Sequence, residues 1–68
     1  MSETTFPLAA IVRLMKANGI ERVSREAAIE FDKKLSAIGT GWSKQIKLLT
    51  THAKRKTAKP EDVKIATE

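Results

Sequence analysis

The apolar residues of the chain recur at α-helical spacing in three separate segments. The first apolar stripe follows the i, i+3, i+4, i+7 pattern and consists of Leu8, Ile11, Val12 and Met15. Before it, Thr5 suits an N-cap and Pro7 suits the first turn of a helix. After it, Asn18 and Gly19 suit a left-handed C-terminal cap. The pattern therefore predicts a short helix between these end signals.

A second, much longer helix is predicted from Ser24, a suitable N-cap, to about Thr51, because no proline interrupts this segment. Its apolar residues alternate at spacings of three and four, with one flanking residue: Ala28, Phe31, Leu35, Ile38, Trp42 and Leu49, flanked by Ile46. Gly39 and Gly41 each weaken a helix by up to about 1 kcal/mol, which leaves a break there as the alternative. The apolar phase continues past both glycines, so one unbroken helix is the better interpretation.

A third, short helix is predicted after the basic run HAKRKTAKPED at residues 52–62. Pro60 suits the first helical position, and Glu61 with Asp62 places carboxylates near the positive end of the helix. The order of short, long and short helix makes the predicted fold class all-α. The basic run then becomes a loop between two helices.

The long helix cannot bury its own apolar seam within one chain. About 28 residues make a helix roughly 42 Å long, whereas a compact domain of this size has a radius of gyration of about 11 Å. A second copy that crosses the middle of the helix would cover the seam. We therefore expect a homodimer with a core of Phe31, Leu35, Ile38 and Trp42.

Composition narrows the class of partner and excludes several kinds of site. The chain has 68 residues, no cysteine and one histidine, which permits one domain but neither a disulfide framework nor a structural zinc site. Its net charge of +5 favours polyanions such as nucleic acid or an acidic membrane surface. The start MSETTF lacks the features of a signal peptide, and no segment approaches a membrane span, so we expect a cytoplasmic protein without a membrane partner.

Catalysis is not expected from these residues. The chain has no glycine-rich phosphate loop and no paired carboxylates at a recognisable spacing beside its single histidine. We expect no enzyme, no cofactor and no metal site.

The segments PLAAIVRLMKANGIERVS and HAKRKTAKPED, in this helix order, resemble the archaeal histones, the minimal histone fold, over about residues 6–66. The resemblance implies a histone-fold domain at 6–68 after an N-terminal extension at 1–5. It also implies an interlocked handshake homodimer, in which each first loop lies beside the second loop of the partner. The implied function is sequence-independent wrapping and compaction of double-stranded DNA on the chromosome.

The same resemblance assigns roles to individual residues. Arg13 would contact phosphate at the dimer centre, and Arg22 would point into the minor groove. Lys56 and Thr57 would complete that site from the neighbouring loop, while Lys16 and Lys54 add positive charge. This chain departs from the family at Lys54, which stands where a small glycine is common.

Further assignments concern the second loop and assembly. Arg55 and Asp62 match a salt bridge that braces the loop against the third helix, and Leu49, His52 and Asp62 match an interface that joins dimers into tetramers or larger assemblies. Pairing with another histone variant remains open. One alternative is a histone-fold dimerisation module that acts mainly in protein–protein assembly. A basic membrane-active helix fits less well, because acidic residues interrupt the polar face of the long helix.

Overall fold

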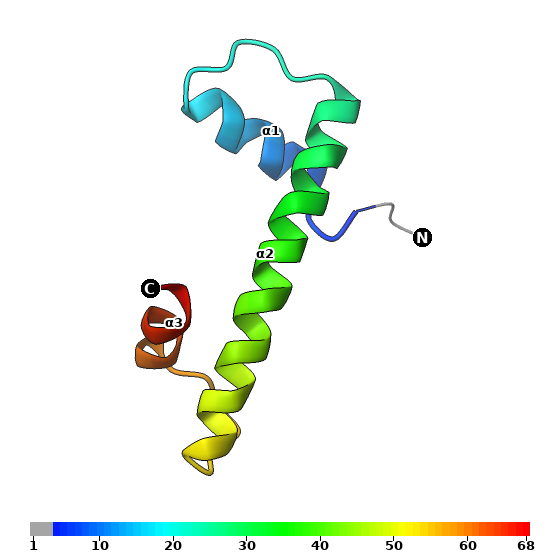
Figure 1. The fold of residues 1–68 in the computed structure, drawn as a ribbon. Helices are drawn as coiled ribbons and strands as arrows, with labels where there is room; N and C mark the ends of the chain where they lie inside the picture. Colours follow the sequence, from blue (N-terminus) through cyan, green and yellow to red (C-terminus); the bar gives the residue numbers. More distant parts are fainter. Residues whose placement is uncertain (1–3) are drawn as a thin grey trace. The chain divides into compact units, whose positions relative to one another are not determined.

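The computed structural model describes residues 4–68, and within this range the chain forms three α-helices and no strand (Figure 1). Helix α1 spans Leu8–Ala17, α2 spans Arg25–His52 and α3 spans Pro60–Thr67. The predicted order of short, long and short helix is confirmed. Helix α2 runs for 28 residues without a break at either glycine. Residues 1–3 of the expected N-terminal extension lie outside the described residues.

The start of α1 differs from the prediction. Pro7 is the N-cap itself, with an extended backbone at φ −61° and ψ 129°, and no side chain caps the helix. The backbone N–H of Thr5 and that of Phe6 instead donate to Asp32 in α2, at 3.1 and 2.8 Å. The chain before α1 is therefore held by a tertiary contact, and Thr5 is not a cap.

The end of α1 and the start of α2 follow the sequence signals. Gly19 has a φ of 96°, and its N–H donates to the carbonyl of Lys16 at 3.0 Å. The next N–H, of Ile20, reaches the carbonyl of Met15 at 3.2 Å, which completes a Schellman motif. At α2, the Ser24 hydroxyl accepts a bond from the N–H of Ala27 at 3.0 Å, as predicted for an N-cap.

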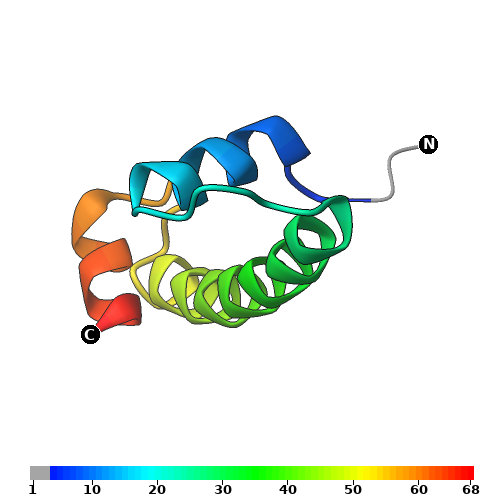
Figure 2. The ribbon, with the colours of Figure 1, turned by 90° about the horizontal axis from the view of Figure 1, so that it is seen from above.

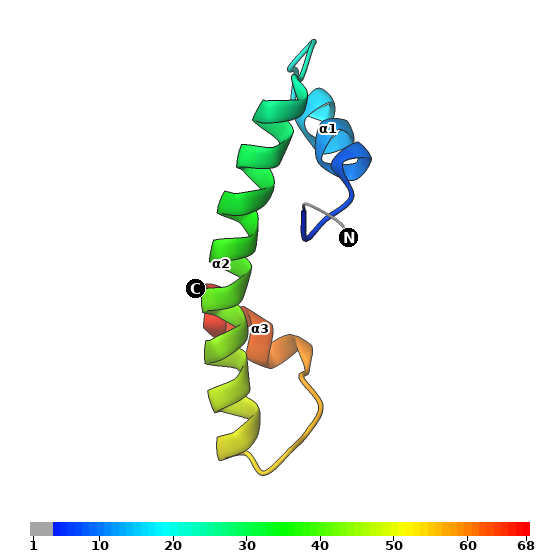
Figure 3. The same cartoon turned by 90° about the vertical axis from the view of Figure 1, so that its right-hand side faces the viewer.

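The chain divides into two compact units, Met1–Ala37 and Ile38–Glu68. In the first, α1 lies beside the first part of α2 (Figure 1, Figure 3), and the loop of residues 18–24 connects them (Figure 2). Ile11 and Ala28 are buried at 3% and 1% exposure. Asp32 is also buried, and its carboxylate fastens the segment before α1 to α2.

In the second unit, α3 lies beside the last part of α2 (Figure 1, Figure 2). The loop of residues 53–59 connects them, and Thr50 and Asp62 are buried on either side of it. Of the predicted dimer core, Phe31 and Leu35 are half-buried, whereas Ile38 and Trp42 are 50% and 43% exposed. A single chain thus leaves the middle of its apolar seam largely uncovered.

A membrane span would require a long helix of apolar residues. None of the three helices within residues 4–68 combines sufficient length with sufficient apolar character to cross a bilayer.

Candidate nucleic-acid interface

The second loop begins with a sharp reversal at the end of α2. The N–H of Lys54 donates to the carbonyl of Thr51 at 3.0 Å, and the N–H of Arg55 donates to the carbonyl of Thr50 at 2.8 Å. These two bonds form a second Schellman motif, with Lys54 as its left-handed residue at φ 60°. Lysine therefore occupies a backbone conformation that favours glycine.

An ion pair fixes the loop to α3. The guanidinium of Arg55 donates two bonds to the two carboxylate oxygens of Asp62, at 3.0 and 2.9 Å, and one to the carbonyl of Thr57 at 2.8 Å. The backbone N–H of Lys59 donates to Asp62 Oδ2 at 2.9 Å. Loop and helix start are thus held by one carboxylate, and the structure contains the Arg55–Asp62 pair expected from the sequence.

These bonds shift the ionisation of both partners. The hydrogen bond from Arg55 is the main cause that lowers the pKa of Asp62 to about 2, and the backbone N–H of Lys59 lowers it further against the opposing effect of burial. The same hydrogen bond raises the pKa of Arg55. The pair therefore stays charged across the whole physiological pH range.

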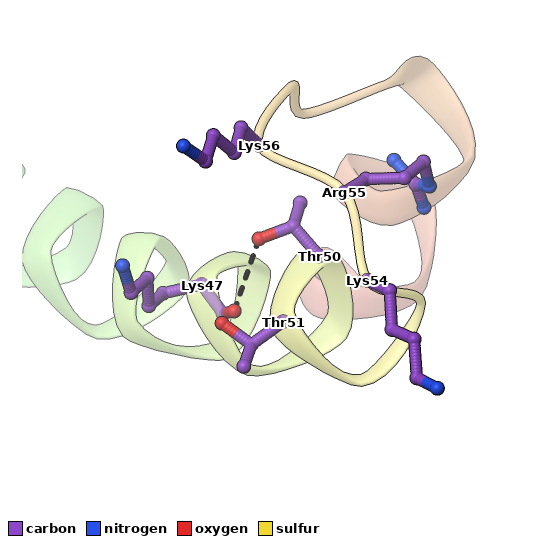
Figure 4. A pocket seen from close by; sticks show the side chains of 6 residues that line it. All are labelled: Lys47, Thr50, Thr51, Lys54, Arg55 and Lys56. Atoms are coloured by element: carbon purple, nitrogen blue, oxygen red, sulfur yellow. Dashed lines mark hydrogen bonds between the residues drawn. The ribbon is translucent and has the colours of Figure 1, made fainter.

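A pocket of about 550 Å³ opens between the end of α2 and the second loop. This second-loop pocket is lined by Lys47, Thr50, Thr51, Lys54, Arg55 and Lys56 (Figure 4). In Figure 4, the ammonium groups of Lys47 and Lys56 extend to the same side, whereas Lys54 points away from them. Because Arg55 is paired with Asp62, the three lysines determine the net charge of the pocket.

The remaining predicted cations lie in the first unit. Arg13 and Lys16 are exposed on α1, away from the buried Ile11, and Arg22 is exposed in the loop of residues 18–24. Lys56 is likewise exposed in the second loop. All of these side chains are accessible to a large anionic ligand. The predicted meeting of a first loop with a second loop involves two chains and remains a prediction.

Comparison with known proteins identifies the family. Residues 4–67 match the family of histone-like transcription factors (CBF/NF-Y) and archaeal histones. The chain belongs to this family. Its three helices are accordingly a histone fold, as predicted.

Two archaeal relatives are similar in sequence to most of this chain. "Probable archaeal histone 3" of Methanocaldococcus jannaschii is 43% identical over 60 residues, which cover 88% of this chain and 90% of the relative. One of the subunits of the archaeal histone HAN1 of Thermococcus zilligii is 40% identical over 60 residues, with the same coverage.

The predicted interface between histone dimers is only partly accessible in the single chain. His52 is exposed as the last residue of α2, and Leu49 is half-buried. Asp62 is only 4% exposed, and its carboxylate accepts three bonds, two on Oδ2 and one on Oδ1. Because each carboxylate oxygen offers two lone pairs, Oδ1 retains capacity for one more donor. A contact between His52 and Asp62 of a neighbouring dimer would use this position and remains a prediction.

Two residues near these sites were missed by sequence reasoning. Lys47 belongs to the second-loop pocket, and its i, i+4 spacing to Thr51 was an available signal that they share a helix face. Asp32 had no such signal, because it binds two backbone N–H groups that lie 26 and 27 residues away. Every residue except proline has a backbone N–H group, so the residue types of the sequence do not reveal which of these groups Asp32 binds.

Proposed function

We propose that this histone-fold protein binds, wraps and compacts double-stranded DNA independently of base sequence, as a chromosomal protein. Family membership supports this function, together with a net charge of +5. The observation that carries the proposal is the second loop. Its Arg55–Asp62 pair fixes the loop internally, while Lys56 and Thr57 remain exposed to a ligand.

The chemistry of the exposed groups suits phosphate. Arg13 on α1 and Lys56 in the second loop would contact backbone oxygens, and the Thr57 hydroxyl would donate to another. Arg22 would enter the narrow minor groove, because a guanidinium is permanently charged and weakly hydrated. Such contacts position DNA without reading its bases.

The binding unit in this proposal is a handshake homodimer. Ile38 and Trp42 are 50% and 43% exposed in one chain, and a second α2 that crosses there would cover them. The same handshake would bring each first loop next to the partner's second loop, so that Arg22, Lys56 and Thr57 form one site. Pairing with another histone variant would produce an equivalent site.

Larger assemblies would form by contact between dimers through Leu49, His52 and Asp62. In these tetramers or longer stacks, His52 would donate to the remaining lone pair of Asp62 Oδ1. Leu49 would add a small apolar patch beside this polar contact.

A binding assay with two unrelated random duplexes tests the function. We expect equal affinity for both and a steep loss of affinity with salt, because each neutralised phosphate contributes about 0.9 to the log–log slope. Arg22→Ala should weaken binding and lower the slope, and Lys33→Ala, an exposed charge change on α2, serves as the control. A strong preference for one duplex, or an Arg22 variant equal to wild type, would count against this recognition mode.

A second candidate is a histone-fold dimerisation module that serves protein assembly. The matched family also includes histone-like transcription factors, which is the observation in its favour. The exposed Arg22, Lys56 and Thr57 would then have no common ligand. Failure to bind random duplex DNA at low salt would favour this candidate.

A further inference from the structure

Besides Lys56, the second-loop pocket is lined by donors that the proposed DNA contact through Lys56 and Thr57 does not use. Lys47 comes from α2, one helical turn before Thr51, and both line the pocket with Lys56 of the loop. Residues at i and i+4 lie on one helix face, so Lys47 and Thr51 present their groups together. The reversal at Lys54 then returns the chain so that Lys56 lies on the same side as Lys47 (Figure 4).

The state of each lining group shows which of them can bind a ligand. Thr50 is 7% exposed, and its hydroxyl already donates to the carbonyl of Lys47 at 3.0 Å. Arg55 is occupied by Asp62 and by the carbonyl of Thr57. By contrast, neither the ammonium of Lys47 nor the hydroxyl of Thr51 has a hydrogen bond within residues 4–68.

The ligand class follows from these donors. Within residues 4–68, the unbonded donors include the ammonium groups of Lys47 and Lys56 and the hydroxyl of Thr51, from a helix and a loop, and no carboxylate is among the residues that line the pocket. Lysine binds phosphate as a point charge, and a hydroxyl adds a directed donor to one oxygen. The pocket volume of about 550 Å³ exceeds that of a single phosphate group.

We infer that Lys47, Thr51 and Lys56 form a phosphate-binding site, which in the DNA complex takes a backbone phosphate next to the one contacted through Thr57. The identification of DNA as the source of the phosphate rests on the proposed DNA-binding function. The binding of phosphate by the pocket does not depend on that function. Lys47 and Thr51 become binding residues that extend the contact from the loop onto the last two turns of α2.

Salt titration of duplex binding provides the first test. Lys47→Gln should lower the log–log salt slope by about 0.9 per chain, so that the ratio of affinities at about 50 and 200 mM salt falls about 3.5-fold per chain. Lys44→Gln removes the same charge from the same helix outside the pocket and should change the slope much less. Lys47→Arg should restore the slope. Equal slopes for the Lys44 and Lys47 variants would mean that both lysines act only through the overall positive charge of the protein. This result would overturn the site.

Thr51→Val tests whether the hydroxyl binds phosphate in addition to the attraction by the lysine charges. The substitution removes the hydroxyl but keeps the branched shape of the side chain and all charges. We expect a several-fold loss of affinity with an unchanged slope. Affinity equal to wild type would remove Thr51 from the site.

Free tripolyphosphate provides an arm that does not depend on DNA. In wild-type protein, it should shift the amide resonances of Thr51 and Lys56 at low salt, and Lys47→Gln should abolish the shifts. If duplex DNA does not bind but these shifts occur, the proposed function is wrong, and the inferred site is retained as a site for a free phosphate ligand. If duplex DNA binds but no shifts occur, the site is overturned while the function stands.

Discussion

The left-handed backbone of Lys54 predicts a stabilising substitution. At φ 60°, the Cβ of a non-glycine residue crowds the following carbonyl, which costs about 1 to 2 kcal/mol. Lys54→Gly removes this cost, while the two Schellman hydrogen bonds, donated by the N–H groups of residues 54 and 55, are kept. Glycine is also more flexible in the unfolded chain, which offsets about 0.5 to 1 kcal/mol of the gain.

The net expectation is a gain of about 0.5 to 1 kcal/mol per chain. For a domain of this size, this corresponds to an increase of about 2 to 8 °C in the thermal midpoint. The assay is thermal and urea unfolding monitored by circular dichroism at one fixed protein concentration, because the midpoint of the proposed dimer would depend on concentration.

Lys54→Ala is the matched control, since it removes the same charge and the same long side chain but retains the Cβ. It should be less stable than Lys54→Gly by about 0.5 to 1 kcal/mol, from the same balance of Cβ strain and flexibility of the unfolded chain. Lys59→Gly provides a second control, because Lys59 has an ordinary extended backbone at φ −118° and should gain nothing from glycine. If Lys54→Gly were no more stable than Lys54→Ala, the strain argument would be refuted.

Four further predictions concern other parts of the chain. Gly19→Ala should destabilise by about 1 to 2 kcal/mol in urea unfolding, through its φ of 96° alone, because a Cβ there would meet nothing within 4 Å. Trp42→Ala should destabilise the dimer by about 3 to 5 kcal/mol, and sedimentation showing a folded wild-type monomer at low micromolar concentration would contradict the dimer core. His52→Ala should still form a dimer that binds DNA but should yield fewer crosslinked tetramers on long duplexes, and equal yields would exclude this interface. The pKa of Asp62 is lowered from 3.8 to about 2, so its contribution is complete above pH 3.8 and is lost as the pH falls through 2; the stability difference between wild type and Asp62→Asn should shrink over that range in acid unfolding.

The sequence by itself determined the helices and most of their ends. Periodic apolar residues, the Ser24 cap and the left-handed Gly19 act within a few residues of one another, so their patterns can be read without knowing the fold. The apolar seam of α2 also predicted that one chain would leave part of the seam uncovered, and Ile38 and Trp42 are 50% and 43% exposed. Resemblance to archaeal histones then supplied the pairing of Arg55 with Asp62, which residue types alone would have left as two exposed charges.

Only the tertiary structure decided the contacts between distant segments. Asp32 holds the chain before α1 through backbone N–H groups 26 and 27 residues away, and this contact displaced the predicted Thr5 cap. Lys47 joins Lys56 in one pocket because the chain reverses at Lys54. The physical reason is the same in both cases: local patterns determine which backbone conformation each segment prefers, whereas the path of the folded chain determines which side chains meet.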